Sequence, residues 1–107
     1  MSYGKLVRDN IPEIIRQNGE EPIIRVLSSD DYKKELEKKL FEEYKEVLEA
    51  QGDERIEELA DLLEVIIALG KIEGKTFEDI IKTCEAKRNK RGAFDQMIYL
   101  KSVKYNK

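Results

Sequence analysis

Two short acidic motifs contain the residues of this sequence that are best suited to chemistry. The first motif has the pattern E-E-x-x-E and the second, further along the chain, has the pattern E-x-x-D; together they comprise Glu42, Glu43, Glu46, Glu58 and Asp61. Each motif ends in two carboxylates three residues apart, which an α-helix places on one face. Oxygen ligands without His or Cys select a hard cation such as Mg²⁺ or Mn²⁺.

A helical hairpin would bring the two motifs together. The sequence predicts a turn at Gly52 between two helices, and residues equidistant from that turn lie at the same height in an antiparallel pair. Glu46 therefore lies level with Glu58, and Glu43 lies level with Asp61. The two levels are about 4.5 Å apart along the axis, and helix axes pack roughly 8 to 10 Å apart. The four carboxylates converge if the two faces turn toward each other.

Convergence would require a cation, because unit charges 4 Å apart repel by about 4 kcal/mol at an effective dielectric constant near 20. The alternative is a solvated face, in which Glu57, Asp61 and Glu64 form one exposed acidic stripe without a function. Glu58, however, shares its helical face with Leu62 and Val65, which is unusual for a purely solvated residue. The pattern alone leaves both interpretations open.

Hydrophobic periodicity predicts four helices that position these acids. A short helix follows Asp9 or Asn10 and ends before Gly19, and a second runs over about residues 30–51. The third covers about residues 54–72; it is apolar almost all round beyond its first turns, so it is predicted to be the most buried. A capping box at Thr76 starts the fourth, which Gly92 ends.

Two further segments have strand-like compositions, residues 22–27 and residues 97–103, and they can pair as a short two-stranded β ribbon. The predicted fold class is therefore mainly α, a helical domain like a four-helix bundle whose ends this ribbon joins. A chain of 107 residues is long enough for one domain with a modest core, so residues 1–107 are predicted to form a single domain.

Composition excludes several function classes. The sequence has no His, which rules out His-based nucleophilic catalysis and His-ligated zinc, and its one cysteine, Cys84, cannot form an internal disulfide. The net charge of -3 favours neither nucleic acid nor an anionic membrane as a partner. We find no apolar signal region and no apolar run long enough to span a membrane. A reducing cytoplasm is the expected location.

The sequence also matches a known pattern outside its acidic motifs. The opening segment KLVRDNIPEII spans Lys5 to Ile15, and the closing segment KRNKRGAF spans Lys87 to Phe94. With the E-E-x-x-E and E-x-x-D motifs, these segments resemble the MazG-like all-α nucleoside triphosphate pyrophosphohydrolases, which include phosphoribosyl-ATP pyrophosphohydrolases and dimeric dUTPases. The resemblance covers nearly the whole chain and is greatest to a small branch of predicted house-cleaning members.

The resemblance implies a helical bundle that assembles as a homo-oligomer, a dimer or a tetramer. It further implies hydrolysis of the α–β phosphoanhydride of a nucleoside triphosphate to a monophosphate and pyrophosphate. By motif position Glu43, Glu46, Glu58 and Asp61 would bind Mg²⁺, with Mn²⁺ as a substitute. Glu42 and Glu46 are the catalytic candidates, and the role of Glu42, either an extra ligand or a base that orients water, stays open. Base and sugar stay open, because the sequence has no Trp and few aromatic residues near the hairpin.

Such a reaction places negative charge on the leaving pyrophosphate, which calls for cations. The candidate phosphate-binding residues precede the first helix or lie near the end of the fourth: Lys5, Arg8, Lys87, Arg88 and Arg91. Basic residues near a helix C-terminus also interact favourably with the helix dipole without any function. Lys87 and Arg91, one turn apart, are the better candidates for a clamp.

Two other function classes stay open. The basic cluster at the end of the fourth helix is a candidate nucleic-acid patch, although the net negative charge makes this partner less favoured. A helical interaction module without catalytic activity is the other alternative, and in it the acids would be solubilising surface. The resemblance makes the enzyme the preferred interpretation.

Overall fold

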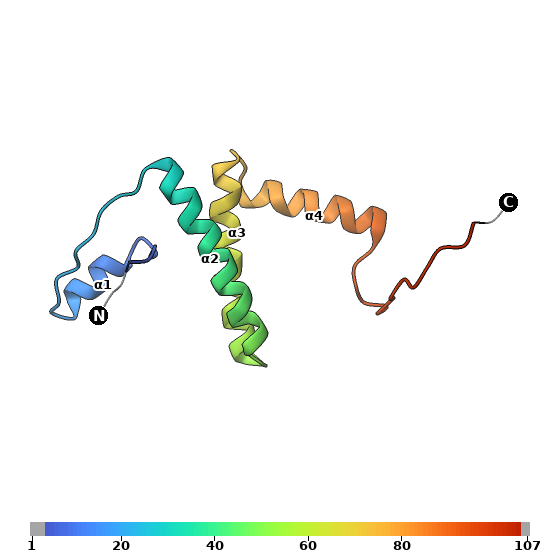
Figure 1. The fold of residues 1–107 in the computed structure, drawn as a ribbon, viewed down its shortest axis with the longest axis horizontal. Coiled ribbons are helices and arrows are strands. Elements are labelled where there is room, and N and C mark those ends of the chain that lie inside the picture. The colour runs from blue at the N-terminus through green and yellow to red at the C-terminus, as the bar shows by residue number, and fades with distance from the viewer. Residues whose placement is uncertain (1–3, 106–107) are drawn as a thin grey trace. The chain divides into compact units, whose positions relative to one another are not determined.

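The fold is given by a computed structural model that describes residues 4–105. These residues form four helices and no strand: α1 (Ile11–Gln17), α2 (Ser29–Glu49), α3 (Asp53–Ile72) and α4 (Phe77–Arg91) (Figure 1). The predicted mainly α fold is confirmed. No helix among the described residues is both long and apolar enough to cross a membrane.

Local side-chain caps explain where two of the helices begin. The Ser28 hydroxyl accepts a hydrogen bond from the Asp31 amide at 3.2 Å, so α2 starts slightly earlier than the hydrophobic pattern indicated. At α4 the Thr76 hydroxyl accepts from the Asp79 amide at 3.2 Å, and the Asp79 carboxylate accepts from the Thr76 amide at 2.9 Å. The predicted capping box is therefore present.

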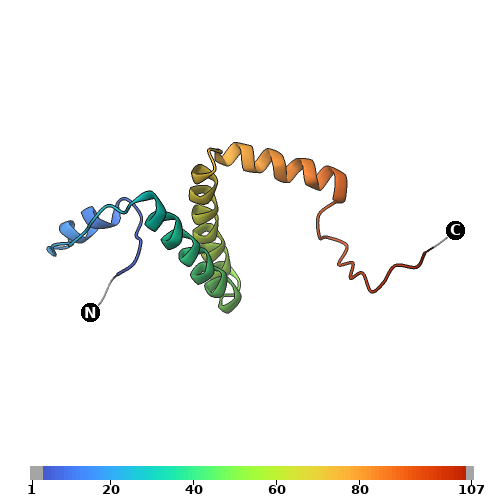
Figure 2. The ribbon, with the colours of Figure 1, turned by 45° about the horizontal axis from the view of Figure 1, so that its top comes forward.

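The hairpin of α2 and α3 is the structural element that holds the acids. The two helices lie side by side and antiparallel in both views (Figures 1 and 2). Gly52 occupies the turn with a φ of 58°, a left-handed conformation that side chains other than glycine rarely adopt. The Arg55 Nε donates to the carbonyl oxygens of Val47 and Ala50, both at 3.1 Å. These bonds satisfy carbonyls that the end of α2 would otherwise leave unpaired.

The core is small. Among the described residues the buried apolar side chains are those of Leu36, Ala50 and Val65. In α3, which was predicted to be the most buried helix, Val65 is buried and residues 66–70 are half-buried, whereas Ile56 and Leu59 in its first turns are exposed. Within its unit α3 packs against α2, so one face is covered and the remaining apolar face meets solvent.

The described chain divides into two compact units between Lys75 and Thr76. The first holds α1, α2 and α3, of which α2 and α3 pack on each other, and the second holds α4 and the segment after it. The single domain over residues 1–107 and the four-helix bundle stay predictions.

The two-stranded ribbon is absent from residues 4–105, where segments 22–27 and 97–103 are both irregular. A ribbon of two strands is marginal unless one face packs on a core. The side chains of Ile23 and Val26 are 99% and 95% exposed, so no such face is present. Strand-like composition alone is therefore not enough to form a β ribbon from these two segments.

Candidate functional site

Three carboxylates converge across the helical hairpin. Glu43 on α2 and Glu58 and Asp61 on α3 each place one carboxylate oxygen within 4.8 Å of the other two. All three residues are half-buried. Their positions agree with the equal heights expected from the distance of each residue to Gly52. We refer to Glu43, Glu58 and Asp61 as the acid cluster.

Two oxygens of the acid cluster lack a partner. Glu43 Oε2 and Glu58 Oε2 are buried and accept no hydrogen bond within the described part of the chain. A buried oxygen without a donor is costly, and it is costlier when it carries negative charge. Oxygen ligands of this kind fit a hard divalent cation such as Mg²⁺, so the residues present are compatible with the implied metal.

Burial and the neighbouring carboxyl of Glu46 raise the pKa of two cluster members. Burial is the main cause of the raised pKa of Glu43, followed by the charge of Glu46 and a hydrogen bond to it. For Glu58 the main cause of the raised pKa is a hydrogen bond to Glu46, followed by burial and the charges of Glu46 and Asp61. A bond between two carboxyls needs a shared proton, so these oxygens are unpaired when every carboxylate is ionised.

The remaining acids of the two motifs lie differently. Glu46 is exposed and lies outside the three-oxygen cluster, although it is close enough to affect both Glu43 and Glu58. Glu42 points to Lys39, whose Nζ lies 3.8 Å from Glu42 Oε2. Of the two catalytic candidates, the structure therefore places Glu46 beside the cluster and pairs Glu42 with a lysine.

A cation from outside the hairpin reaches the cluster. Arg8 Nη2 donates to Asp61 Oδ1 at 2.6 Å, and the two side chains are 58% and 45% exposed. The sequence predicted Arg8 as a phosphate-binding residue but not this ion pair. Nothing in the sequence could have indicated it, because the two residues are far apart in the chain and share no helical spacing. Lys5, the neighbouring candidate, is exposed.

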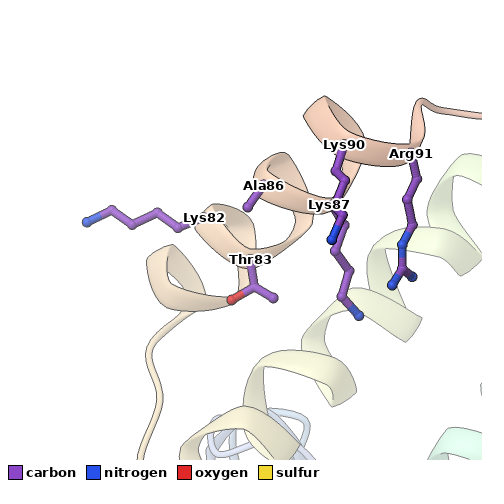
Figure 3. Close-up of a pocket in the computed structure, with 6 residues that line it drawn as sticks. All are labelled: Lys82, Thr83, Ala86, Lys87, Lys90 and Arg91. Carbon is purple, nitrogen blue, oxygen red and sulfur yellow. The ribbon is translucent and has the colours of Figure 1, made fainter.

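The second unit carries a basic hollow on α4. It is shallow, has a volume of about 430 Å³, and is lined by Lys82, Thr83, Ala86, Lys87, Lys90 and Arg91. The side chains of Lys87, Lys90 and Arg91 leave the same side of α4, while that of Lys82 extends in another direction (Figure 3). We call this feature the basic hollow.

Two of the three phosphate-binding candidates on α4 line the basic hollow, and the third does not. Lys87 and Arg91 line it, as expected for side chains one turn apart. Arg88 does not line it, and its Nη2 instead lies 3.7 Å from Cys84 Sγ, in a hydrogen bond. Lys82 and Lys90 also line the hollow, although neither was among the predicted phosphate-binding residues.

Comparison with known proteins adds a partial relative. No family model matches the chain, and no solved structure matches it. A stretch of 43 residues, 40% of the chain, is 54% identical to an uncharacterized protein of Mycolicibacterium smegmatis (strain ATCC 700084 / mc(2)155). The match spans 44% of that protein's length, less than half. Because the relative is uncharacterized, the similarity brings no activity, substrate or partner to this chain.

Proposed function

We propose that this chain is a Mg²⁺-dependent nucleoside triphosphate pyrophosphohydrolase that serves in nucleotide-pool house-cleaning. It would cleave the α–β phosphoanhydride and release a nucleoside monophosphate and pyrophosphate. The observation that supports the proposal most is the convergence of Glu43, Glu58 and Asp61 with two unpaired buried oxygens. The resemblance of the acidic motifs to MazG-like enzymes supplies the reaction.

The acid cluster would hold the metal, with Glu46 at its border as a further ligand. When bound, Mg²⁺ neutralises phosphate oxygens and lowers the pKa of a bound water. Glu46 is suited to accept the proton of the attacking water, because it is exposed and lies next to Glu43 and Glu58. Glu42, paired with Lys39, would orient that water from further out.

The proposed hydrolysis transfers one proton and breaks one bond. The water oxygen attacks the α-phosphorus, the bond from that phosphorus to the bridging oxygen breaks, and pyrophosphate leaves with the bond electrons. The proton of the water passes to Glu46. Within the first unit, Lys5 and Arg8 are the candidate cations for the charge on pyrophosphate, and on α4 the candidates are Lys87 and Arg91 of the basic hollow.

The exposed apolar residues of the hairpin favour a homo-oligomer, dimer or tetramer. Several large side chains of α2 and α3 are open to solvent: Phe41, Tyr44, Leu48, Ile56, Leu59 and Leu63. Apolar surface of this extent is typical of an interaction surface. Hairpins from two copies would then complete a four-helix bundle, and segments 22–27 and 97–103 would find strand partners in the assembled protein.

Nucleic-acid binding is a second candidate function, favoured by one observation. The basic hollow is followed in the chain by the exposed aromatic residues Phe94, Tyr99 and Tyr105. Cations beside aromatic side chains are typical of single-strand binding. The net charge of -3 and the acid cluster favour the hydrolase instead.

The direct test is a screen of canonical and modified nucleoside triphosphates with Mg²⁺ or Mn²⁺, in which released pyrophosphate is measured. Glu58→Gln keeps the size of a cluster residue and removes its charge, so turnover of the best substrate should fall by about a hundredfold or more. Glu57→Gln is the matched control, because Glu57 is adjacent but exposed. Absence of metal-dependent pyrophosphate release from every substrate, or equal turnover of both variants, would reject the proposal.

A further inference from the structure

We propose that Arg8 is a displaceable counter-ion of the acid cluster. Its guanidinium holds Asp61 while no metal is bound, and a divalent cation must displace it to bind that carboxylate. The inference rests on the proposed metal site and concerns how that site is filled.

The ion pair itself is the primary observation. Arg8 Nη2 lies 2.6 Å from Asp61 Oδ1, a short charge-assisted hydrogen bond. The other ion pairs of residues 4–105 that we observe, Arg16 with Glu13 and Lys39 with Glu42, each join residues one helical turn apart. The Arg8 pair instead joins the segment before α1 to the middle of α3. It is therefore a tertiary contact between two segments.

The position of Arg8 allows it to leave. Its side chain is 58% exposed, so water can solvate the guanidinium after release. The Arg8 carbonyl accepts a hydrogen bond from the Ile11 amide at 3.1 Å, which places Arg8 in the turn that leads into α1. Since α1 makes no helix-to-helix contact with α2 or α3, this segment can detach without disrupting a packed core.

Arg8 and a metal ion compete for the carboxylate of Asp61 because both are positively charged. Asp61 contributes an oxygen to the acid cluster, so a divalent cation held there would lie close to the guanidinium and repel it. The unpaired oxygens of Glu43 and Glu58 show that Arg8 satisfies only part of the cluster. Exposed ion pairs are weak, so the divalent cation displaces Arg8 from Asp61. The competition with Arg8 lowers the affinity of the acid cluster for the cation only a few-fold. The released guanidinium is then free to grip a phosphate.

The test measures Mn²⁺ binding without nucleotide by calorimetry, for the full chain and four variants: Arg8→Gln, Arg8→Lys, Arg16→Gln and Asp61→Asn. Arg8→Gln should bind Mn²⁺ about two- to fivefold more tightly than wild type, the range that an exposed ion pair supports. Arg8→Lys, which keeps the charge but loses the fork, should lie between them. Arg16→Gln is the matched control: it removes the same charge from a residue paired with Glu13 in α1, and it should bind like wild type.

A second readout follows the segment itself. Saturating Mn²⁺ should speed hydrogen exchange over residues 5–17 in wild type, because the contact to Asp61 is lost. In Arg8→Gln that exchange should be fast from the start and independent of Mn²⁺. Circular dichroism checks that each variant keeps its helices.

The outcomes separate this inference from the metal site on which it rests. Unchanged or weaker Mn²⁺ binding by Arg8→Gln overturns the inference, as does an equal gain in Arg16→Gln, which would indicate a general charge effect. If Mn²⁺ binding is nevertheless lost in Asp61→Asn, the metal site stands and only the inference fails. If neither wild type nor Arg8→Gln binds Mn²⁺ at millimolar concentration, or if Asp61→Asn binds as wild type does, the proposed metal site fails with it.

Discussion

The two charged regions of this chain differ in how much tertiary structure they require. The acid cluster gathers residues from two helices, is half-buried, and leaves two oxygens unpaired. The basic hollow lies on α4 alone, and α4 has no buried residue. One region is therefore assembled by packing, whereas the other follows from helical periodicity.

The difference shows which of the two is the stronger sign of function. Exposed Lys and Arg near the end of a helix are stabilised by water and by the helix dipole, so their clustering has little cost. Acidic side chains that crowd in a partly buried place have raised pKa values, as Glu43 and Glu58 do through burial and their neighbours Glu46 and Asp61, and this has a cost that a bound cation removes. The acid cluster is therefore the main support for the proposed function, and the basic hollow is additional support.

The largest expected effect is at the assembled region. Asp61→Asn removes a charged ligand at constant size, and pyrophosphate release should fall by about a thousandfold because the hard anionic oxygen is lost. Glu64→Gln is the control, since Glu64 is exposed on the same helix and lies outside the cluster. Steady-state kinetics with helix content by circular dichroism measures both. Wild-type turnover by Asp61→Asn would remove the hairpin as the active site.

A smaller effect is expected at the basic hollow. Lys87→Ala should lower kcat/KM about tenfold by removing a phosphate contact, whereas Arg88→Ala, whose side chain lies outside the hollow, should change it little. If both substitutions instead leave hydrolysis intact and weaken oligonucleotide binding with a steep salt dependence, α4 is a nucleic-acid surface. Kinetics and a filter-binding salt titration distinguish the two results.

The smallest effect is a pH dependence of stability in the metal-free protein. The pKa values of Glu43 and Glu58 are raised above the ordinary 4.5, so between that value and the raised pKa the folded state binds more protons than the unfolded state. The melting temperature should therefore rise by a few degrees as the pH falls from 7 toward 5.

The control for this prediction removes the cause of the crowding. Glu46→Gln takes away the charge that acts on both residues, so its melting temperature at pH 7 should exceed that of wild type and depend less on pH. Saturating Mg²⁺ should also stabilise wild type and flatten its pH dependence. A wild-type melting temperature that falls steadily between pH 7 and 5 would contradict the crowding of the acids.

Much of the fold followed from local rules. The capping box at Thr76, the turn at Gly52 and the helical periodicity on either side depend on residues within four positions of each other, so the sequence alone determined them. The proximity of Glu43 and Asp61 followed as well, because residues equally distant from a tight turn lie at the same height in two antiparallel helices. The β ribbon is not present in residues 4–105, because pairing of segments 22–27 and 97–103 depends on a covering partner that local sequence does not specify.

Only the tertiary structure decided which charges touch. Glu42 and Glu43 are neighbours in one motif, yet Glu42 pairs with Lys39 while Glu43 enters the cluster, a difference set by how α2 is rotated against α3. The contact of Arg8 with Asp61 depends on the path of the chain before α1, which no spacing encodes. Periodicity determines the face of a helix on which a residue lies, but the packing of distant segments determines what that residue meets.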